Sequence, residues 1–233
     1  HDVIPKRSRT KPTPLYPPSN SPDFGCPTMS DRFRTVLLFG APGAGKGTQG
    51  KILGTVPGYY HCSCGDVFRN IDVSSELGKI FYEHSSRGEL VPDDVTVRIW
   101  KEAIDGNVAA GLYKPKRDLL VLDGIPRTVE QAQIMKQHID VLKVIFLSCN
   151  DEQAMFDRLR RRALRENRHD DADEKVIRNR WKVYEKETAP VLEQYPNDRV
   201  ALIDAVQSPA TVLRDVLNVI MPIQEDRFQP FAA

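Results

Sequence analysis

Val36-Leu-Leu-Phe39, followed at once by Gly40-Ala-Pro-Gly-Ala-Gly45-Lys46-Gly47-Thr48, is the stretch of this 233-residue sequence that decides its fold. The apolar run is typical of a buried strand, and the glycines let the chain turn so that successive backbone N–H groups point inward. The helix that we expect after the turn adds positive potential at its N-terminus. Lys46 can then reach the β and γ phosphates as a point charge, so the pattern predicts a P-loop that binds a nucleoside triphosphate.

The rest of the chain alternates between short apolar runs and longer stretches with helical periodicity. Near-continuous apolar strands separated by helices predict a parallel sheet that is covered on both faces. We therefore expect an α/β fold, a P-loop core with a five-stranded parallel sheet whose ligands bind at the carboxyl ends of the strands. Helices are expected at Glu174–Lys186 and Pro209–Ile220, and strands at Thr35–Phe39, Tyr59–Cys62, Leu119–Leu122, Val141–Cys149 and Val200–Ile203.

The composition is that of an ordinary globular protein, and its net charge of +1 gives no bias toward nucleic acid or membranes. No apolar run approaches the roughly 20 residues that span a bilayer. The cysteines at positions 26, 62, 64 and 149 match neither a disulfide framework nor a zinc site, which predicts reduced thiols in a cytoplasmic protein. No signal peptide is expected, because the N-terminus lacks an apolar core. Residues 1–28 hold seven of the 17 prolines, so we expect a disordered tail or leader, with a Pro-rich docking segment as the alternative.

A second motif, Asp123-Gly124-Ile-Pro-Arg127-Thr128, follows an expected strand, with Gln131 close behind. A carboxylate at the end of such a strand, beside a P-loop, is where Mg²⁺ or its water shell is oriented. An aspartate there can also simply cap a turn. Arg127 favours the phosphate-site interpretation, because a guanidinium can grip a phosphate with two parallel hydrogen bonds.

Six arginines lie between positions 158 and 168, and another follows at position 180. Such charges repel one another unless anions gather them, although a solvated helix face or a nucleic-acid patch are alternatives. In a helix, Arg158, Arg162 and Arg165 share one face, whereas Arg160 and Arg161 point elsewhere and are expected to be solvated. No aromatic residues interleave with the arginines, which argues against nucleic-acid binding and favours a triphosphate role for a subset of them.

Five motifs, in this order along the chain, resemble those of the adenylate kinases and cover about residues 35–221. They are Gly40–Gln49, Ser63–Arg69, Gly88–Asp93, Asp123–Gln131 and the arginine-bearing segment from Asp157 to Arg180. The resemblance implies reversible Mg²⁺-dependent phosphoryl transfer, ATP + AMP = 2 ADP, which maintains adenine nucleotide balance. A UMP/CMP-type nucleoside monophosphate kinase is the alternative, and a non-catalytic nucleotide sensor is a third hypothesis.

The resemblance also implies roles for individual residues of this sequence. The residues expected to bind ATP are Gly43, Ala44, Gly45, Lys46, Gly47, Thr48, Arg158 and Arg162. Those expected to bind AMP are Cys64, Arg69, Leu90, Val91, Gly124, Arg127, Gln131, Arg168 and Arg180. The expected catalytic residues are Lys46, Arg127, Arg162, Arg168 and Arg180. Asp123 is expected to orient Mg²⁺ through water, with no direct protein ligand to the metal.

The implied organisation is a core with two closing lobes. The core comprises residues 29–62, 94–157 and 172–222, the AMP-binding lobe residues 63–93, the short ATP lid residues 158–171, and the C-terminal tail residues 223–233. The short lid implies a monomer without structural zinc, whose partners are ATP and AMP and not nucleic acid or a membrane. Cys64 and Ile125 depart from the family pattern, which usually has Thr and Phe there, and they leave the pyrimidine alternative open.

Overall fold

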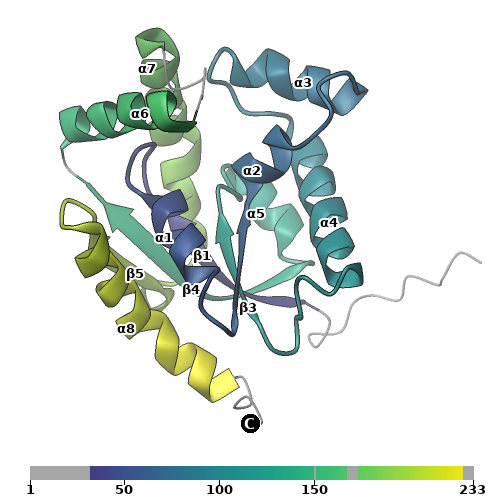
Figure 1. Cartoon of the computed structure of the whole chain (residues 1–233), viewed down its shortest axis with the longest axis vertical. Helices are drawn as coiled ribbons and strands as arrows, with labels where there is room; N and C mark the ends of the chain where they lie inside the picture. Colours follow the sequence, from purple (N-terminus) through teal and green to yellow (C-terminus); the bar gives the residue numbers. More distant parts are fainter. Residues whose placement is uncertain (1–31, 150, 167–172, 228–233) are drawn as a thin grey trace, which may run out of the picture.

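The structure is a computed structural model that describes residues 32–149, 151–166 and 173–227. Its centre is a five-stranded parallel sheet in the order β2-β3-β1-β4-β5 (Figure 1). The strands are β1 Phe33–Phe39, β2 Tyr59–Ser63, β3 Leu119–Asp123, β4 Ile139–Ser148 and β5 Val200–Asp204. This confirms the predicted α/β class and all five expected strands, although β4 begins two residues earlier than its apolar run indicated.

The register of the sheet brings the ends of three strands together. β1 lies between β3 and β4, and Leu38 of β1 is level with Asp123 at the end of β3. Ser63, the last residue of β2, is level with the same aspartate. Because parallel strands all end at one edge, the loops that follow β1, β2 and β3 leave the sheet side by side.

One or more helices follow each strand. They are α1 Lys46–Leu53, α2 Cys64–Arg69, α3 Glu76–Ser85, α4 Asp93–Ala109, α5 Val129–Met135, α6 Glu152–Glu166, α7 Glu174–Val183 and α8 Pro209–Arg227. The helical backbone after α7 continues through a π-helical turn at Tyr184–Thr188 and a 3-10 helix at Ala189–Gln194. Both expected helices are confirmed, and α8 extends past its expected end and through Pro222 to Arg227.

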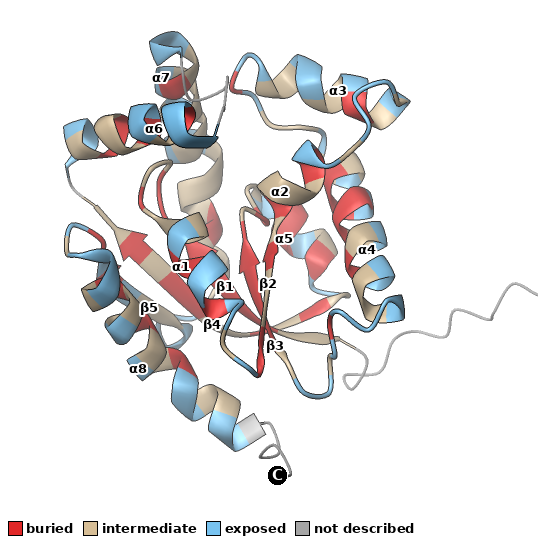
Figure 2. Ribbon diagram, in the orientation of Figure 1, coloured by how far each residue is buried: buried red, intermediate tan, exposed pale blue. Residues whose placement is uncertain are grey.

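Helices cover both faces of the sheet, whose strands are largely buried (Figure 2). Successive residues of a strand point to opposite faces, and β1 divides its side chains accordingly. Leu37 packs in a cluster with Trp100 of α4, whereas Leu38 packs on the other side with Leu53 of α1 and Val216 of α8. Burying a Leu side chain contributes about 1.5–3 kcal/mol. Because β1 is buried on both faces, nearly all of its residues must be apolar.

Two short helices at the carboxyl edge begin with a side-chain cap. The Ser63 hydroxyl accepts a hydrogen bond from the backbone N–H of Asp66, and the Thr128 hydroxyl accepts one from that of Gln131. Such a cap satisfies a donor that the helix leaves unpaired and contributes about 1 kcal/mol. The caps therefore fix where α2 and α5 start relative to the strand ends.

Candidate active site

The P-loop after β1 has the conformation that its glycines predict. Gly43 and Gly45 have φ angles of 89° and 97°, values that side chains with a Cβ rarely adopt. A Cβ on Gly43 would also lie 2.8 Å from the carbonyl oxygen of Met155, so the loop packs closely on α6. The loop then leads into α1, whose first residue is Lys46.

The amine of Lys46 lies in a strongly positive region. Its Nζ donates hydrogen bonds to the carbonyl oxygens of Gly40 and Ala41, at 2.6 and 3.1 Å. Burial lowers the pKa of Lys46 to about 8, and the negative charge of Asp123 opposes that shift. Three guanidinium charges add to the shift, those of Arg127, Arg162 and Arg180. Four cations, three from the helices α1, α6 and α7 and one from the loop after β3, therefore interact at one place, which favours an anion there.

Asp123 ends β3 beside the start of α1 and is only 7% exposed. Its Oδ2 lies 3.7 Å from the place where a Cβ on Gly47 would stand. A buried carboxylate next to a P-loop suits a hard cation that keeps some of its waters. Asp123 therefore fits the predicted role of orienting a nucleotide-bound metal ion.

A pocket of about 1110 Å³, counted with the space open to solvent, lies beyond the P-loop and reaches Lys46. Seven residues expected to bind AMP line it: Arg69, Leu90, Val91, Gly124, Arg127, Gln131 and Arg180. Cys64 lies just behind this wall, with its Cβ 3.8 Å from the place of a Cβ on Gly124. Burial raises the pKa of the Cys64 thiol to about 12, so the thiol is protonated and unreactive at neutral pH.

The sequence reasoning missed an aromatic part of this pocket wall. Phe68 of α2 and Phe81 of α3 stack with their ring centroids 5.1 Å apart and their planes 17° from parallel. Stacked rings give a flat apolar surface against which a planar base can pack. Their spacing of 13 residues spans two helices and gives no periodic signal, so only the fold brings them together.

The pocket wall also holds a hydrogen-bond network around Gln131, which is 1% exposed. Its Oε1 accepts a hydrogen bond from the backbone N–H of Arg127 at 2.7 Å, and its Nε2 donates one to Asp93 at 2.7 Å. The Arg127 side chain is held in turn, because its Nε donates to the carbonyl oxygen of Gly124 at 2.8 Å. Asp93 opens α4 and belongs to the predicted motif Gly88–Asp93, but its hydrogen bond with Gln131 was not predicted.

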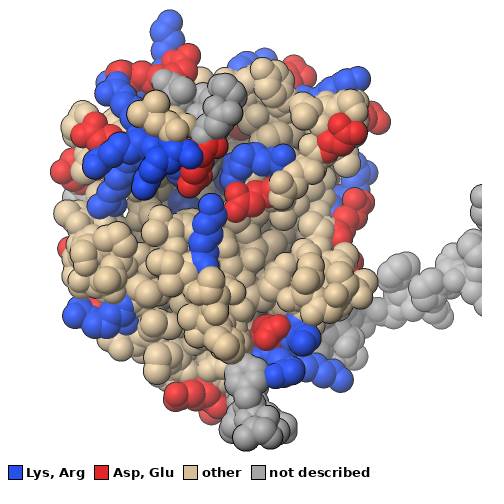
Figure 3. All heavy atoms as spheres, in the orientation of Figure 1, with Lys and Arg blue, Asp and Glu red and all other residues tan. Residues whose placement is uncertain are grey.

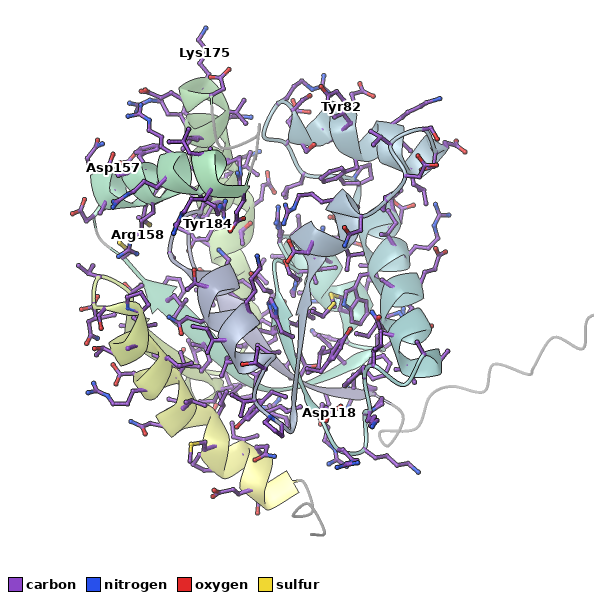
Figure 4. The ribbon with its side chains drawn as sticks, viewed as in Figure 1. Tyr82, Asp118, Asp157, Arg158, Lys175 and Tyr184 are labelled. Carbon is purple, nitrogen blue, oxygen red and sulfur yellow. The ribbon has the colours of Figure 1, made fainter. Side chains whose placement is uncertain are left out.

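The arginines of α6 divide between the site and the surface. Arg158 points from α6 toward the loop after β5 (Figure 4), where its Nη1 donates to the carbonyl oxygen of Ala205 at 3.0 Å. Arg162 is half-buried near Lys46, whereas Arg165 is exposed despite sharing the predicted face. Arg160 and Arg161 are exposed, as predicted.

Charged side chains gather on this face of the molecule. In Figure 3, lysine and arginine side chains lie over α6 and around the hollow above α1. Arg160 forms an ion pair with Glu174 of α7, so it joins two helices at the surface. Arg168, a predicted member of both the catalytic and the AMP-binding set, lies outside the described residues, as does the rest of the lid beyond Glu166.

Residues 63–93 contact α7 at a point that the sequence did not reveal. The side-chain amide of Asn179 donates a hydrogen bond to the carbonyl oxygen of Arg87 at 2.6 Å. Next to it, a Cβ on Gly88 would lie 2.9 Å from Cγ of Arg180. The segment after α3 is therefore packed against the helix that carries an expected catalytic arginine.

The described residues contain neither a cluster of metal ligands nor a membrane-spanning helix. No three His, Cys, Asp or Glu side chains among them are grouped so that they could hold a metal ion directly. No helix among them is long and apolar enough to cross a membrane.

The P-loop residues Gly40 and Lys46 and the arginine that follows β3, Arg127, line one and the same pocket. This is the fold and site of a nucleoside monophosphate kinase, a phosphotransferase that holds two nucleotides at once. A family model described as "Adenylate kinase" matches residues 38–200. The chain belongs to the adenylate kinase family, so it is an ATP-binding transferase.

Relatives in three bacteria carry the same description, adenylate kinase. The protein of Flavobacterium psychrophilum is 36% identical over 193 residues, which are 78% of this chain and 97% of the relative. The protein of Mycolicibacterium smegmatis is 40% identical over 186 residues, which are 79% of this chain and 98% of the relative. The protein of a Cyanothece species is 34% identical over 200 residues, which are 82% of this chain and 97% of the relative. None of these descriptions favours the pyrimidine kinase alternative.

Proposed function

We propose that this chain catalyses the reversible transfer of the terminal phosphoryl group of ATP to AMP, giving two ADP and so maintaining adenine nucleotide balance. The observation that carries the proposal is the convergence of Lys46 with Arg127, Arg162 and Arg180 between the P-loop and the pocket. Phosphoryl transfer between two phosphates requires little proton transfer, because the acceptor is already anionic. Alignment and charge neutralisation are then the main tasks of the protein.

The donor occupies the P-loop in this proposal. Backbone N–H groups of residues 43–48 hold the phosphates, and Lys46 contacts the β and γ phosphates. Two of the three N–H donors of the Lys46 amine bond the carbonyl oxygens of Gly40 and Ala41, which leaves the third for that contact. Arg162 neutralises the transferring group, and Arg158 stacks on the adenine of ATP close to the Ala205 carbonyl.

The acceptor occupies the pocket. Arg69 of α2, Arg127 of the loop after β3 and Arg180 of α7 bind its phosphate, which leaves its oxygen aimed at the donor. The base lies toward Leu90 and Val91, with Gln131 at its edge. Cys64 contributes its small apolar surface behind Gly124 in place of a hydroxyl.

The family uses a divalent metal with its nucleotides, and we propose Mg²⁺ with ATP, oriented through water by Asp123. The burial of this carboxylate beside Gly47 supports the assignment. When bound, the ion neutralises phosphate oxygens of the donor. Arg168 completes the catalytic set in this proposal, although it lies outside the described residues.

We further propose the expected division into a core, an AMP-binding lobe at residues 63–93 and an ATP lid at residues 158–171. Closing these parts over the nucleotides would exclude water, which otherwise competes as the acceptor. A monomer in the cytoplasm is proposed as well. The free thiols of Cys62, Cys64 and Cys149 are typical of a reducing compartment and support that location.

The test is phosphoryl transfer from Mg-ATP to a panel of AMP, dAMP, CMP, UMP and GMP. Rapid ADP formation with AMP is expected, and equal or faster transfer to CMP or UMP would contradict the proposal. Arg127→Ala should lower kcat by about 100- to 1,000-fold, by analogy with the loss of one donor to a transition-state anion. Arg161→Ala is the matched control, since that arginine is exposed on α6, and it should keep near-normal activity.

A further inference from the structure

The direction of the Gln131 side-chain amide is fixed from both ends. Its Oε1 faces the backbone N–H of Arg127 and its Nε2 faces Oδ1 of Asp93, both at 2.7 Å. A backbone N–H can only donate a hydrogen bond, and an ionised carboxylate can only accept one. Turning the amide over would therefore break both hydrogen bonds. It would place the Gln131 NH2 group against the N–H of Arg127 and the Gln131 oxygen against the carboxylate of Asp93.

A side-chain amide has two hydrogens and two lone pairs. Asp93 uses one hydrogen and Arg127 uses one lone pair, so one donor and one acceptor of Gln131 remain for a ligand in the pocket. A 6-aminopurine offers an amine donor and a ring-nitrogen acceptor on its pairing edge, which matches that remaining pair. A 6-oxopurine offers the reverse order, a carbonyl acceptor and an N–H donor, and leaves two groups unpaired.

We propose that Asp93 is a positioning residue for acceptor choice: it holds the Gln131 amide in the direction that accepts a 6-aminopurine nucleotide and rejects a 6-oxopurine nucleotide. The inference rests on the proposed function, specifically on Gln131 facing the base of the acceptor. Sites built to hydrogen-bond a ligand discriminate strongly, because the wrong ligand leaves their buried polar groups without partners.

The neighbouring residue offers a matched control. Asp93 and Asp94 are both acidic residues in the first turn of α4, so both favour the positive end of that helix. Asp94 is exposed and is not part of the pocket wall, whereas Asp93 is half-buried and bonded to Gln131. A change that acts only through helix stability should therefore be similar in the two alanine variants.

The experiment measures kcat and KM with Mg-ATP and either AMP or IMP as acceptor, in full-length variants. Asp93→Ala should raise KM for AMP more than it lowers kcat. It should also narrow the preference in kcat/KM for AMP over IMP by about 10-fold, the value expected for one hydrogen bond to a charged group. Asp93→Asn should retain most of the preference, because its amide oxygen can accept the same hydrogen bond. Asp94→Ala should leave KM and the preference unchanged.

The double variant separates positioning from folding. In a Gln131→Leu background, Asp93→Ala should change neither KM nor the preference further, because nothing remains to be positioned. Equal effects of Asp93→Ala and Asp94→Ala would overturn the inference, and so would a further rise of KM in the double variant. If the alanine variant does not fold, Asp93→Glu keeps the charge but shifts the carboxylate by one methylene, and it should raise KM several-fold.

Failure of the proposed function would give a different result. If Gln131→Leu alone leaves KM for AMP unchanged, Gln131 does not face the acceptor base, and the proposed AMP site is wrong together with the inference. If Gln131→Leu raises KM while Asp93→Ala does not, the AMP site stands and only the role of Asp93 is overturned.

Discussion

Gly88 and Gly111 form a matched pair for testing how residues 63–93 are held against α7. Both have left-handed backbone conformations, with φ angles of 70° and 71°, and both follow the end of a helix. A Cβ on Gly88 would lie 2.9 Å from the carbonyl oxygen of Val176 and from Cγ of Arg180. A Cβ on Gly111 would meet no described atom within 4 Å. Replacing each with alanine separates backbone strain from the contact with α7.

The sizes of the two effects follow from these surroundings. The left-handed conformation costs a residue with a Cβ about 1–2 kcal/mol, so Gly111→Ala should lower the free energy of unfolding by that amount. Gly88→Ala carries the same strain and also an overpacked contact, which adds about 1–3 kcal/mol. Since 1 kcal/mol shifts Tm by about 2–4 °C at this size, Gly111→Ala should lower Tm by about 2–8 °C and Gly88→Ala by more.

The activity of the two variants should also differ. The overlap at Gly88 can be relieved by moving the segment away from α7 or by displacing Arg180, and either movement disturbs the proposed AMP pocket, which both residues line. If about 1 kcal/mol of binding is lost, KM for AMP rises about 5-fold in Gly88→Ala, whereas Gly111→Ala keeps the normal value. Thermal melts and steady-state rates measure both effects. Equal losses of Tm with unchanged KM in both variants would refute the packing of Gly88 on α7.

Three further outcomes are expected. ATP affinity should fall as the pH rises through about 8, because Lys46 then loses the positive charge that binds the phosphates. Titration calorimetry from pH 7 to 9.5 measures this, and an ATP affinity that does not change with pH would contradict it. Asn179→Ala removes the hydrogen bond to Arg87 and should lower the free energy of unfolding by about 0.5–1.5 kcal/mol, measured by denaturant unfolding. It should also raise KM for AMP, measured from steady-state rates. The Cβ of Gly50→Ala would overlap the imidazole of His61 and should lower the free energy of unfolding by about 1–3 kcal/mol. Adding His61→Ala in the same chain should restore most of that loss, and no restoration would contradict the overlap.

The sheet and the P-loop were predictable because their signals are local. A strand buried on both faces must be apolar along nearly its whole length, and the central strands β1 and β3 show this most clearly within five to seven residues. The P-loop likewise needs its glycines at fixed offsets from Lys46. The pocket residues were predicted from the resemblance of the motifs to those of the family. The register of the sheet then brings the ends of three strands together at Asp123.

The contacts that complete the site were not predictable, because they join residues far apart in sequence. The hydrogen bond from Gln131 to Asp93 spans 38 positions, and that from Asn179 to Arg87 spans 92. Neither pair leaves a periodic pattern, and an aspartate in the first turn of a helix is already explained by the helix dipole. Only the packing of α4 against α5 and of α7 against residues 63–93 reveals a second role for these side chains.

Arg127 joins the base side of the pocket to the phosphate side. Its backbone N–H holds Gln131, its Nε is bonded to the carbonyl oxygen of Gly124, and its own carbonyl oxygen accepts a hydrogen bond from Thr188 at 2.9 Å. A base that disturbs Gln131 therefore also disturbs Arg127, the residue that we propose aligns the acceptor phosphate. Because small misalignments slow phosphoryl transfer strongly, the wrong acceptor should be penalised in kcat as well as in KM.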